Sequence, residues 1–177
     1  MLSPKLETKR LILRRLEESD LDAMYEIISD NRLADYIQFP RLSKDEELAY
    51  IRFLIKEADV SSEEKWIIEL KENHEPIGNI SVNDVNKRNN FCTVGYVVRY
   101  EYWGNGYATE ALKTVSDYLL NERKYHLVEG VCNERNLSSS RVLIKAGFKK
   151  DGYVANRRLN KDGTYSGIEY YSKIKWD

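Results

Sequence analysis

The sequence predicts a mixed α+β fold, with a mostly antiparallel central sheet, flanking helices and one βαβ crossover. Apolar runs at Lys65–Leu70, Ile77–Val82 and Phe91–Val98 are separated by short polar connectors, as antiparallel hairpins require. An amphipathic helix then leads to a further apolar run at Leu127–Cys132. A connection through a helix of this length predicts that this strand lies parallel to the strand before the helix.

Two helices are predicted in the N-terminal part of the chain. A strand over Arg10–Leu16 precedes the first helix, and Ser19 is expected to cap its start. The second helix is expected to begin at Ser43, whose hydroxyl and the Glu46 carboxylate form a capping-box pattern. The residues expected on the buried faces of the two helices are Leu21, Met24, Tyr25 and Ile28, and Leu48, Ile51, Ile55 and Ala58.

The C-terminal part predicts one more helix and two more strands. The helix lies within Asn133–Phe148 and stops at Gly147, with Phe148 available for the hydrophobic contact of a C-terminal cap. The tail, Lys149–Trp176, predicts two strands joined by a turn in which Gly163 takes positive φ. One face of the last strand is expected in the core because the following residues alternate along it: Ile168, Tyr170, Ser172, Ile174 and Trp176.

Composition narrows the class of protein. A chain of 177 residues with 42% hydrophobic residues suits one globular domain, residues 1–177. With 28 basic and 29 acidic residues, the charge pattern predicts neither a nucleic-acid partner nor a membrane partner. The lack of a signal-like or spanning apolar run predicts a soluble, cytoplasmic protein. Cys92 and Cys132 lie in strand-like segments and are expected to be reduced, buried residues; a nucleophilic Cys132 is the less favoured alternative. No metal site is predicted.

The stretch most informative about function is Val94–Leu120, in which a strand, a glycine loop and a helix follow directly on one another. Gly104 and Gly106 allow a tight turn and close approach of a ligand. The free N–H groups and the positive dipole end of the helix then suit a diphosphate. A plain turn is the alternative interpretation. The loop is not a Walker A loop, because no Lys-Ser/Thr follows, and Thr109 stands where a Rossmann motif has glycine.

The segment Trp103–Ala108 resembles motif A of the GNAT acetyltransferases, Gln/Arg-x-x-Gly-x-Gly/Ala. Gly106 and Ala108 match, whereas Trp103 replaces the Gln or Arg. The aromatic residue is similar to the branch that contains the ribosomal-protein alanine and serine N-acetyltransferases. About thirty residues later, the chain resembles the family's second signature, Asn-x-x-Ser-x-Arg-Val-Leu-x-Lys-x-Gly-Phe, with Asn136 and Ser139 in register.

The resemblance implies the GNAT acyl-CoA N-acyltransferase fold, with acetyl-CoA as co-substrate. In the family, the loop amides hold the diphosphate, the preceding strand lends backbone groups to the pantetheine arm, and the Asn of the second signature touches that arm. The implied cofactor-binding residues are Tyr96, Val98, Trp103, Gly104, Asn105, Gly106, Tyr107, Ala108, Thr109 and Asn136. Ser139 is implied to lie near the thioester sulfur, where it would deliver a proton to the departing thiolate.

The chemistry of amine acetylation requires a neutral nitrogen, an oxyanion partner and a proton for the thiolate. An α-amine, with a pKa near 8, is already partly neutral at cellular pH, so the base can be weak or act through water. Backbone N–H groups around Val98 are expected to polarise the carbonyl. Candidate bases are Glu129, Glu134 and Asp84, each of which has an ordinary solvated or paired carboxylate as its alternative interpretation. His74 and His126 are the two histidines, and a histidine base is not favoured.

The sequence therefore predicts an acetyl-CoA-dependent N-acetyltransferase that acts by direct transfer in a ternary complex, as a monomer or homodimer. The acceptor is either a protein N-terminus or a small amine. The loop Asn31–Pro40, with Tyr36 and Phe39, is expected to wall the acceptor pocket. Some ribosomal-protein acetyltransferases carry a carboxylate where this chain has Arg157 and Arg158, which puts that substrate in doubt. The alternatives are a non-catalytic acyl-CoA-binding module or regulator and, more weakly, another kind of nucleotide-binding domain.

Overall fold

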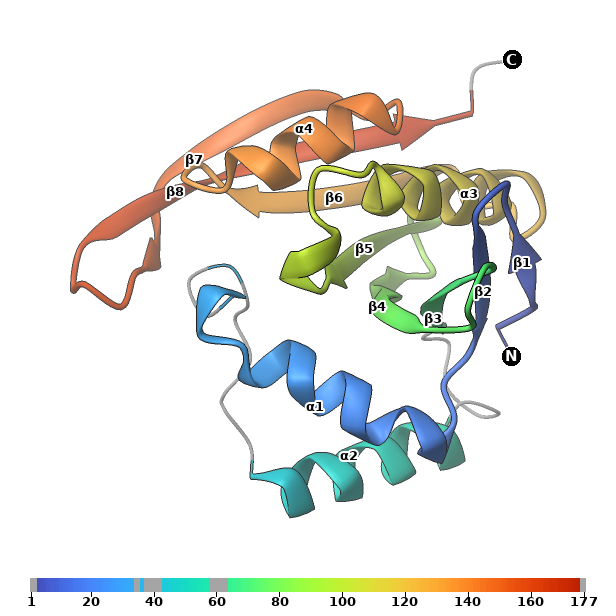
Figure 1. The fold of residues 1–177 in the computed structure, drawn as a ribbon. Helices are drawn as coiled ribbons and strands as arrows, with labels where there is room; N and C mark the ends of the chain where they lie inside the picture. The colour runs from blue at the N-terminus through green and yellow to red at the C-terminus, as the bar shows by residue number, and fades with distance from the viewer. Residues whose placement is uncertain (1–2, 34–35, 37–42, 58–63, 176–177) are drawn as a thin grey trace. The chain divides into compact units, whose positions relative to one another are not determined.

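The computed structural model describes residues 3–33, 36, 43–57 and 64–175 (Figure 1). The strands among them are β1 Leu6–Glu7, β2 Leu11–Arg15, β3 Lys65–Leu70, β4 Pro76–Asn86, β5 Phe91–Val98, β6 Leu127–Asn133, β7 Lys149–Leu159 and β8 Tyr165–Ile174. The α-helices are α1 Leu21–Ser29, α2 Lys44–Glu57, α3 Tyr107–Asn121 and α4 Leu137–Lys145. Short 3₁₀ helices are η1 Glu18–Asp20, η2 Asn31–Leu33 and η3 Tyr100–Tyr102.

The predicted α+β class is confirmed by the sheet. Within the described part of the chain, eight strands pair in the order β1-β2-β3-β4-β5-β6-β8-β7. The neighbours β2 and β3, β3 and β4, and β6 and β8 are antiparallel, whereas β5 and β6 are parallel, as the crossover through α3 requires. The parallel register joins Phe91–Val94 to Leu127–Gly130.

The chain divides into two compact units, Met1–Ser81 with Tyr96–Tyr107, and Val82–Gly95 with Ala108–Asp177. In the first unit α1 and α2 lie side by side (Figure 1). Their apolar faces meet β2 and β3 in a core of Leu16, Met24, Ile51 and Ile67. Burial of this face, rather than helix propensity, is the main source of stability for helices of this length.

The predicted capping box of α2 is confirmed. α1 begins at Leu21, as the sequence indicates, but the predicted cap by Ser19 is wrong. The Ser43 hydroxyl accepts the Glu46 N–H at 3.3 Å, and the Ser43 N–H donates to the Glu46 carboxylate at 2.8 Å. Before α1, Ser19 lies inside η1 instead of capping a helix. The Asp20 carboxylate accepts the Glu17 N–H at 2.8 Å, so this buried acid fixes the entry to α1.

One strand, β4, extends well beyond its predicted end, and another, β1, was not predicted. β4 runs on to Asn86 through residues expected to form a connector, because a hairpin can extend into solvent with polar residues once it has left the core. The two-residue β1, which pairs with β2, was not anticipated, since a strand this short carries no periodic signal. Cys92 and Cys132 are buried free thiols, as expected.

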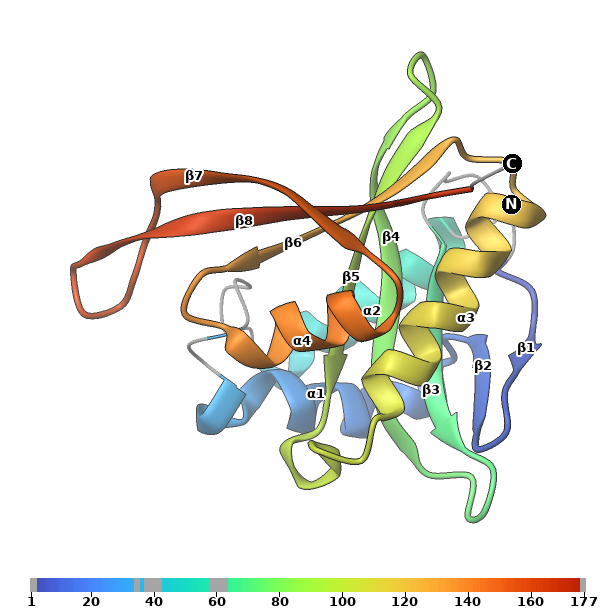
Figure 2. The same cartoon turned by 90° about the horizontal axis from the view of Figure 1, so that it is seen from above.

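The second unit contains the long β7–β8 hairpin, which runs beside β6 (Figure 2). Its turn has Gly163 at φ +78°, as predicted. α4 ends as expected, with Gly147 at φ +94° and the Phe148 N–H donating to the Leu143 carbonyl at 3.0 Å. The predicted core face of β8 is wrong: Tyr171, on the opposite face, is only 2% exposed, whereas Ile168, Tyr170, Ser172 and Ile174 are half-buried. Ala58, Phe39 and Trp176 lie outside the described residues.

None of the helices in the described segments is long and apolar enough to cross a bilayer.

Candidate functional site

A glycine loop connects β5 and η3 to the first turn of α3. Gly104 and Gly106 both have φ +80°, a conformation that costs other residues about 1–2 kcal/mol. The three residues Gly104, Asn105 and Gly106 are exposed, so the backbone here is open to a ligand. The N–H groups of the first turn of α3 have no acceptor within the helix, and the helix dipole is positive at this end. The segment therefore has the geometry of an anion-binding turn.

Side chains within the loop hold its shape. The Trp103 indole N–H donates to the Val98 carbonyl at 2.8 Å, at the end of β5. The Asn105 amide donates to the carbonyls of Tyr102 and Trp103, both at 3.2 Å. Trp103 and Asn105 are predicted to contact the cofactor, and their side chains also stabilise the conformation of the loop. A loop braced in this way loses less conformational freedom when a ligand binds.

Trp103 also belongs to an aromatic cluster. Its ring lies 5.5 Å from that of Tyr36 and 5.1 Å from that of Tyr100, measured between centroids. Tyr36 comes from the loop predicted to wall an acceptor pocket, and it contacts the residue that precedes Gly104. Tyr96 and Val98, the predicted cofactor contacts on β5, are half-buried and buried respectively.

The first unit contains a pocket of about 360 Å³, and two of its lining residues are sequence neighbours of Tyr100. Its lining residues come from α1, η2 and the chain on either side of Tyr100: Glu26, Ile27, Ser29, Asp30, Arg32, Arg99 and Glu101. The Arg32 guanidinium binds Asp30 at 2.6 Å and lies 4.4 Å from the centre of the Tyr100 ring. Hydrogen bonds from Arg32 hold the pKa of Asp30 below its usual value. The Arg32 guanidinium, a planar cation, is thus bound within the pocket by a carboxylate and an aromatic ring.

Predicted site residues in the second unit gather at the start of α4. Asn136 is the N-cap, and its side-chain oxygen accepts the Ser139 N–H at 3.0 Å. Ser139 is half-buried in the first turn of α4. The cap therefore fixes the backbone of Ser139 at the start of the helix.

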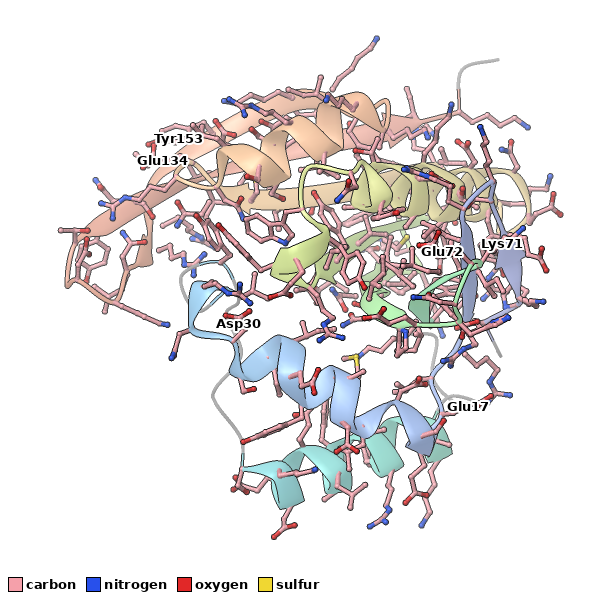
Figure 3. The ribbon with its side chains drawn as sticks, in the orientation of Figure 1. Glu17, Asp30, Lys71, Glu72, Glu134 and Tyr153 are labelled. Carbon is pink, nitrogen blue, oxygen red and sulfur yellow. The ribbon has the colours of Figure 1, made fainter. Side chains whose placement is uncertain are left out.

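The candidate bases differ in their surroundings. The Glu134 carboxylate accepts the Gly167 N–H at 2.6 Å and the Tyr153 hydroxyl at 2.8 Å, and Figure 3 shows Glu134 and Tyr153 next to each other. These two hydrogen bonds lower the pKa of Glu134. Glu129, on β6, accepts the Thr93 hydroxyl at 3.3 Å. Asp84 lies on β4 with φ +44° and is exposed.

The remaining titratable candidates carry structural contacts. His74 lies in the β3–β4 turn, and its ring nitrogen Nδ1 lies 2.7 Å from the Glu69 carboxylate. The backbone N–H of His126 donates to the Asn90 carbonyl at 2.8 Å. Burial raises the pKa of Cys132 to about 12, which opposes thiolate formation at neutral pH.

The structure assigns the predicted site residues to both units. Tyr96, Val98 and Trp103–Tyr107 lie in the first unit, and Ala108, Thr109, Glu129, Glu134, Asn136 and Ser139 lie in the second. Sequence reasoning missed Arg10, whose guanidinium donates to the Asn105 carbonyl at 3.0 Å. The one signal that could have identified it is Thr8, a residue that favours a turn, two positions before it.

Comparisons with known proteins identify the family of the chain. Residues 10–149 match the family model of the acetyltransferase (GNAT) domain. The uncharacterized N-acetyltransferase YoaA of Bacillus subtilis is 28% identical over 173 residues, which cover 97% of each chain.

Solved structures share the fold at lower identity. The ribosomal-protein-S5-alanine acetyltransferase of Vibrio fischeri superposes with a TM-score of 0.86 at 21% identity, over 99% of this chain and 98% of that one. RimL, a ribosomal L7/L12 α-N-protein acetyltransferase solved in complex with coenzyme A, has a TM-score of 0.86 at 19% identity, over 97% and 98% of the two chains. With the family model covering most of its length, the chain belongs to the GNAT acetyltransferase family.

Proposed function

We propose that the protein transfers the acetyl group of acetyl-CoA to a primary amine, directly and within a ternary complex. The observation that carries this proposal is the exposed loop with Gly104 and Gly106 at φ +80°, which leads straight into the N-terminus of α3. Backbone N–H groups and a helix dipole bind the diphosphate of a CoA ester without a dedicated lysine. The structure of RimL with coenzyme A supports the same ligand here.

The reaction needs one bond made and one broken. The neutral amine nitrogen attacks the thioester carbon, the C–N bond forms, and the C–S bond breaks as the tetrahedral intermediate collapses. The nitrogen loses a proton, and the thiolate gains one. In our proposal, a backbone N–H near Val98 stabilises the oxyanion, and Ser139 delivers the proton to sulfur. Both roles are carried over from the family resemblance.

The base need not be strong. An α-amine with a pKa near 8 is partly neutral at cellular pH, so Glu129, Asp84 or a water molecule suffices. Glu134 is disfavoured as the base, since its lowered pKa makes its carboxylate a poor proton acceptor. Its engagement by Gly167 and Tyr153 is also what favours the second candidate function, a non-catalytic acyl-CoA-binding module.

The acceptor is proposed to enter the pocket of the first unit. Three lining carboxylates, Glu26, Asp30 and Glu101, face two guanidiniums, so the lining carries one excess negative charge. This favours a positively charged amine, either a protein N-terminus or a small molecule. We further propose that the two units form one domain, because the family model spans both, and that the protein works in the cytoplasm as a monomer or homodimer, without a nucleic-acid or membrane partner.

The test is to measure coenzyme A binding by calorimetry and free-thiol release from acetyl-CoA over a panel of amines. The panel contains peptides with free N-termini, polyamines and amino-acid derivatives. Thiol release that depends on an amine, with formation of the acetylated product, supports the enzyme. Coenzyme A binding without turnover on any amine supports the module, and absence of binding contradicts both.

A further inference from the structure

Arg10 lies against the glycine loop although 95 residues separate it from Asn105 in the sequence. One guanidinium nitrogen, Nη1, donates to the Asn105 carbonyl at 3.0 Å. The other, Nη2, is 3.6 Å from the point where a Cβ on Gly106 would stand. The guanidinium carbon lies 4.4 Å from the centre of the Tyr107 ring, within cation–π range. The Arg10 side chain therefore contacts Asn105 and Tyr107 and lies close to Gly106 between them.

The backbone of Arg10 is itself held on several sides. The Thr8 hydroxyl accepts the Leu11 N–H at 2.8 Å and the Arg10 N–H at 3.2 Å, which fixes the turn between β1 and β2. The Lys71 N–H donates to the Arg10 carbonyl at 2.9 Å and ties this turn to the end of β3. Arg10 thus projects from a rigid turn, so its grip on the loop does not depend on the ligand.

The hydrogen bond from Arg10 also determines the orientation of the peptide between Asn105 and Gly106. A trans peptide is planar, with its C=O and N–H pointing in opposite directions. When Arg10 holds the Asn105 carbonyl on one side, the Gly106 N–H must face the other side. Without that hold, glycine at position 106 makes a peptide flip cheap, and a flip would present a carbonyl oxygen to an anion.

We propose that Arg10 is a positioning residue for the diphosphate of acetyl-CoA, an inference that rests on the function proposed above. Arg10 acts through the Asn105–Gly106 peptide: it keeps the Gly106 N–H directed at the ligand, and its positive charge aligns that peptide dipole with the negative diphosphate. The Arg10 guanidinium packs over the Tyr107 ring, and the Tyr102 ring packs against Tyr107 with 6.2 Å between the ring centroids.

The experiment compares two acetyl donors on Arg10→Met and the wild-type protein. Acetyl-CoA carries the diphosphate, and acetylpantetheine does not. For Arg10→Met we expect the KM for acetyl-CoA and the Kd for coenzyme A to rise about tenfold or more, as for loss of a charged hydrogen bond. The KM for acetylpantetheine and the kcat with either donor should stay the same. A purely structural role would change both donors alike, and that result would overturn the inference.

Matched variants keep the test decisive. Lys9→Met removes a charge from the same turn at an exposed position and should leave both donors unchanged. Arg10→Lys keeps the charge but loses the planar guanidinium. Its KM for acetyl-CoA should lie between those of wild type and Arg10→Met. If Arg10→Met does not fold, Arg10→Lys takes its place in the comparison. Wild-type protein that fails to bind coenzyme A overturns the proposed function as well. Wild-type binding with an equally tight Arg10→Met overturns only the role of Arg10.

Discussion

The Tyr153 hydroxyl donates a hydrogen bond of 2.8 Å to the Glu134 carboxylate, whose other oxygen accepts the Gly167 N–H at 2.6 Å. The Glu134 N–H in turn donates to the Gly167 carbonyl at 3.0 Å. The Tyr153 ring covers Gly167 so closely that a Cβ there would stand 2.2 Å from it. The end of β6 is thereby clamped to both strands of the β7–β8 hairpin.

For Glu134→Gln we expect an unchanged pH dependence of kcat/KM, because a carboxyl whose pKa is lowered below 4.5 is already ionised throughout the neutral range. The melting temperature should fall, since the two donors bond to different oxygens of Glu134 and the Gln amide keeps only one acceptor oxygen. Tyr153→Phe, which removes only one donor, is the matched variant and should lower the melting temperature less. A folded Glu134→Gln protein that loses the acidic limb of its pH profile would identify Glu134 as the base after all.

Ser139→Ala should reduce kcat by about a hundredfold, the lower range for loss of a general acid. Coenzyme A affinity should change little, because the backbone N–H that Asn136 caps is still present. Ser138→Ala, on the same helix turn and exposed, is the control and should keep full activity. Stopped-flow thiol release gives kcat, and calorimetry gives the affinity. Unchanged turnover in Ser139→Ala would remove Ser139 from the mechanism.

Gly106→Asp should abolish coenzyme A binding, because it places a side chain and a negative charge at the turn proposed to hold a diphosphate. Part of any effect comes from backbone strain at φ +80°. Gly163→Asp controls for this part, since Gly163 has φ +78° and open space around it but lies in the β7–β8 turn. Calorimetric titration should show no binding to Gly106→Asp and normal binding to Gly163→Asp. Equal binding to both would mean that the loop does not hold the diphosphate.

Arg14 is the centre of a buried ionic network. Its guanidinium binds Asp20 at 2.7 and 2.9 Å and also contacts Glu69. The Asp20 and Glu69 side chains are buried, at 2% and 6% residue exposure. Burial alone raises the pKa of Glu69, but hydrogen bonds from Arg14 and His74 lower it overall. This carboxylate therefore stabilises the fold above its unfolded pKa of about 4.5, and that contribution is lost as the pH falls through its lower folded value.

Arg14→Met should lower the free energy of unfolding by about 3 kcal/mol at neutral pH, because two carboxylates stay buried without their partner. The difference from wild type should shrink below pH 4.5, where protonation relieves the unpaired acids. Urea titrations at both pH values measure the effect. Arg52→Met, which breaks the exposed pair with Glu18, is the control and should change stability little. A difference that grows in acid would contradict this account.

Local rules of sequence predicted most of the elements. The capping box at Ser43, the stop at Gly147 and the turn at Gly163 each depend on residues within a few positions of one another, and the structure confirms all three. Ser19 does not cap the helix. The neighbouring Asp20 is instead held by a hydrogen bond from Arg14, a residue of the preceding strand. The predicted buried face of β8 was wrong because alternation gives the period of a strand but does not say which of its two faces packs more tightly.

The sequence by itself determined the family and the glycine turn, because both depend on short, contiguous motifs whose backbone requirements can be read from residue type. Only the tertiary structure decided which side chains support that turn. Arg10 meets Asn105 because the β1–β2 turn and the glycine loop come together in the folded chain, and no sequence pattern links two residues that are 95 positions apart. The same holds for Glu134: its neighbours Gly167 and Tyr153 come from two other strands, and their hydrogen bonds lower its pKa.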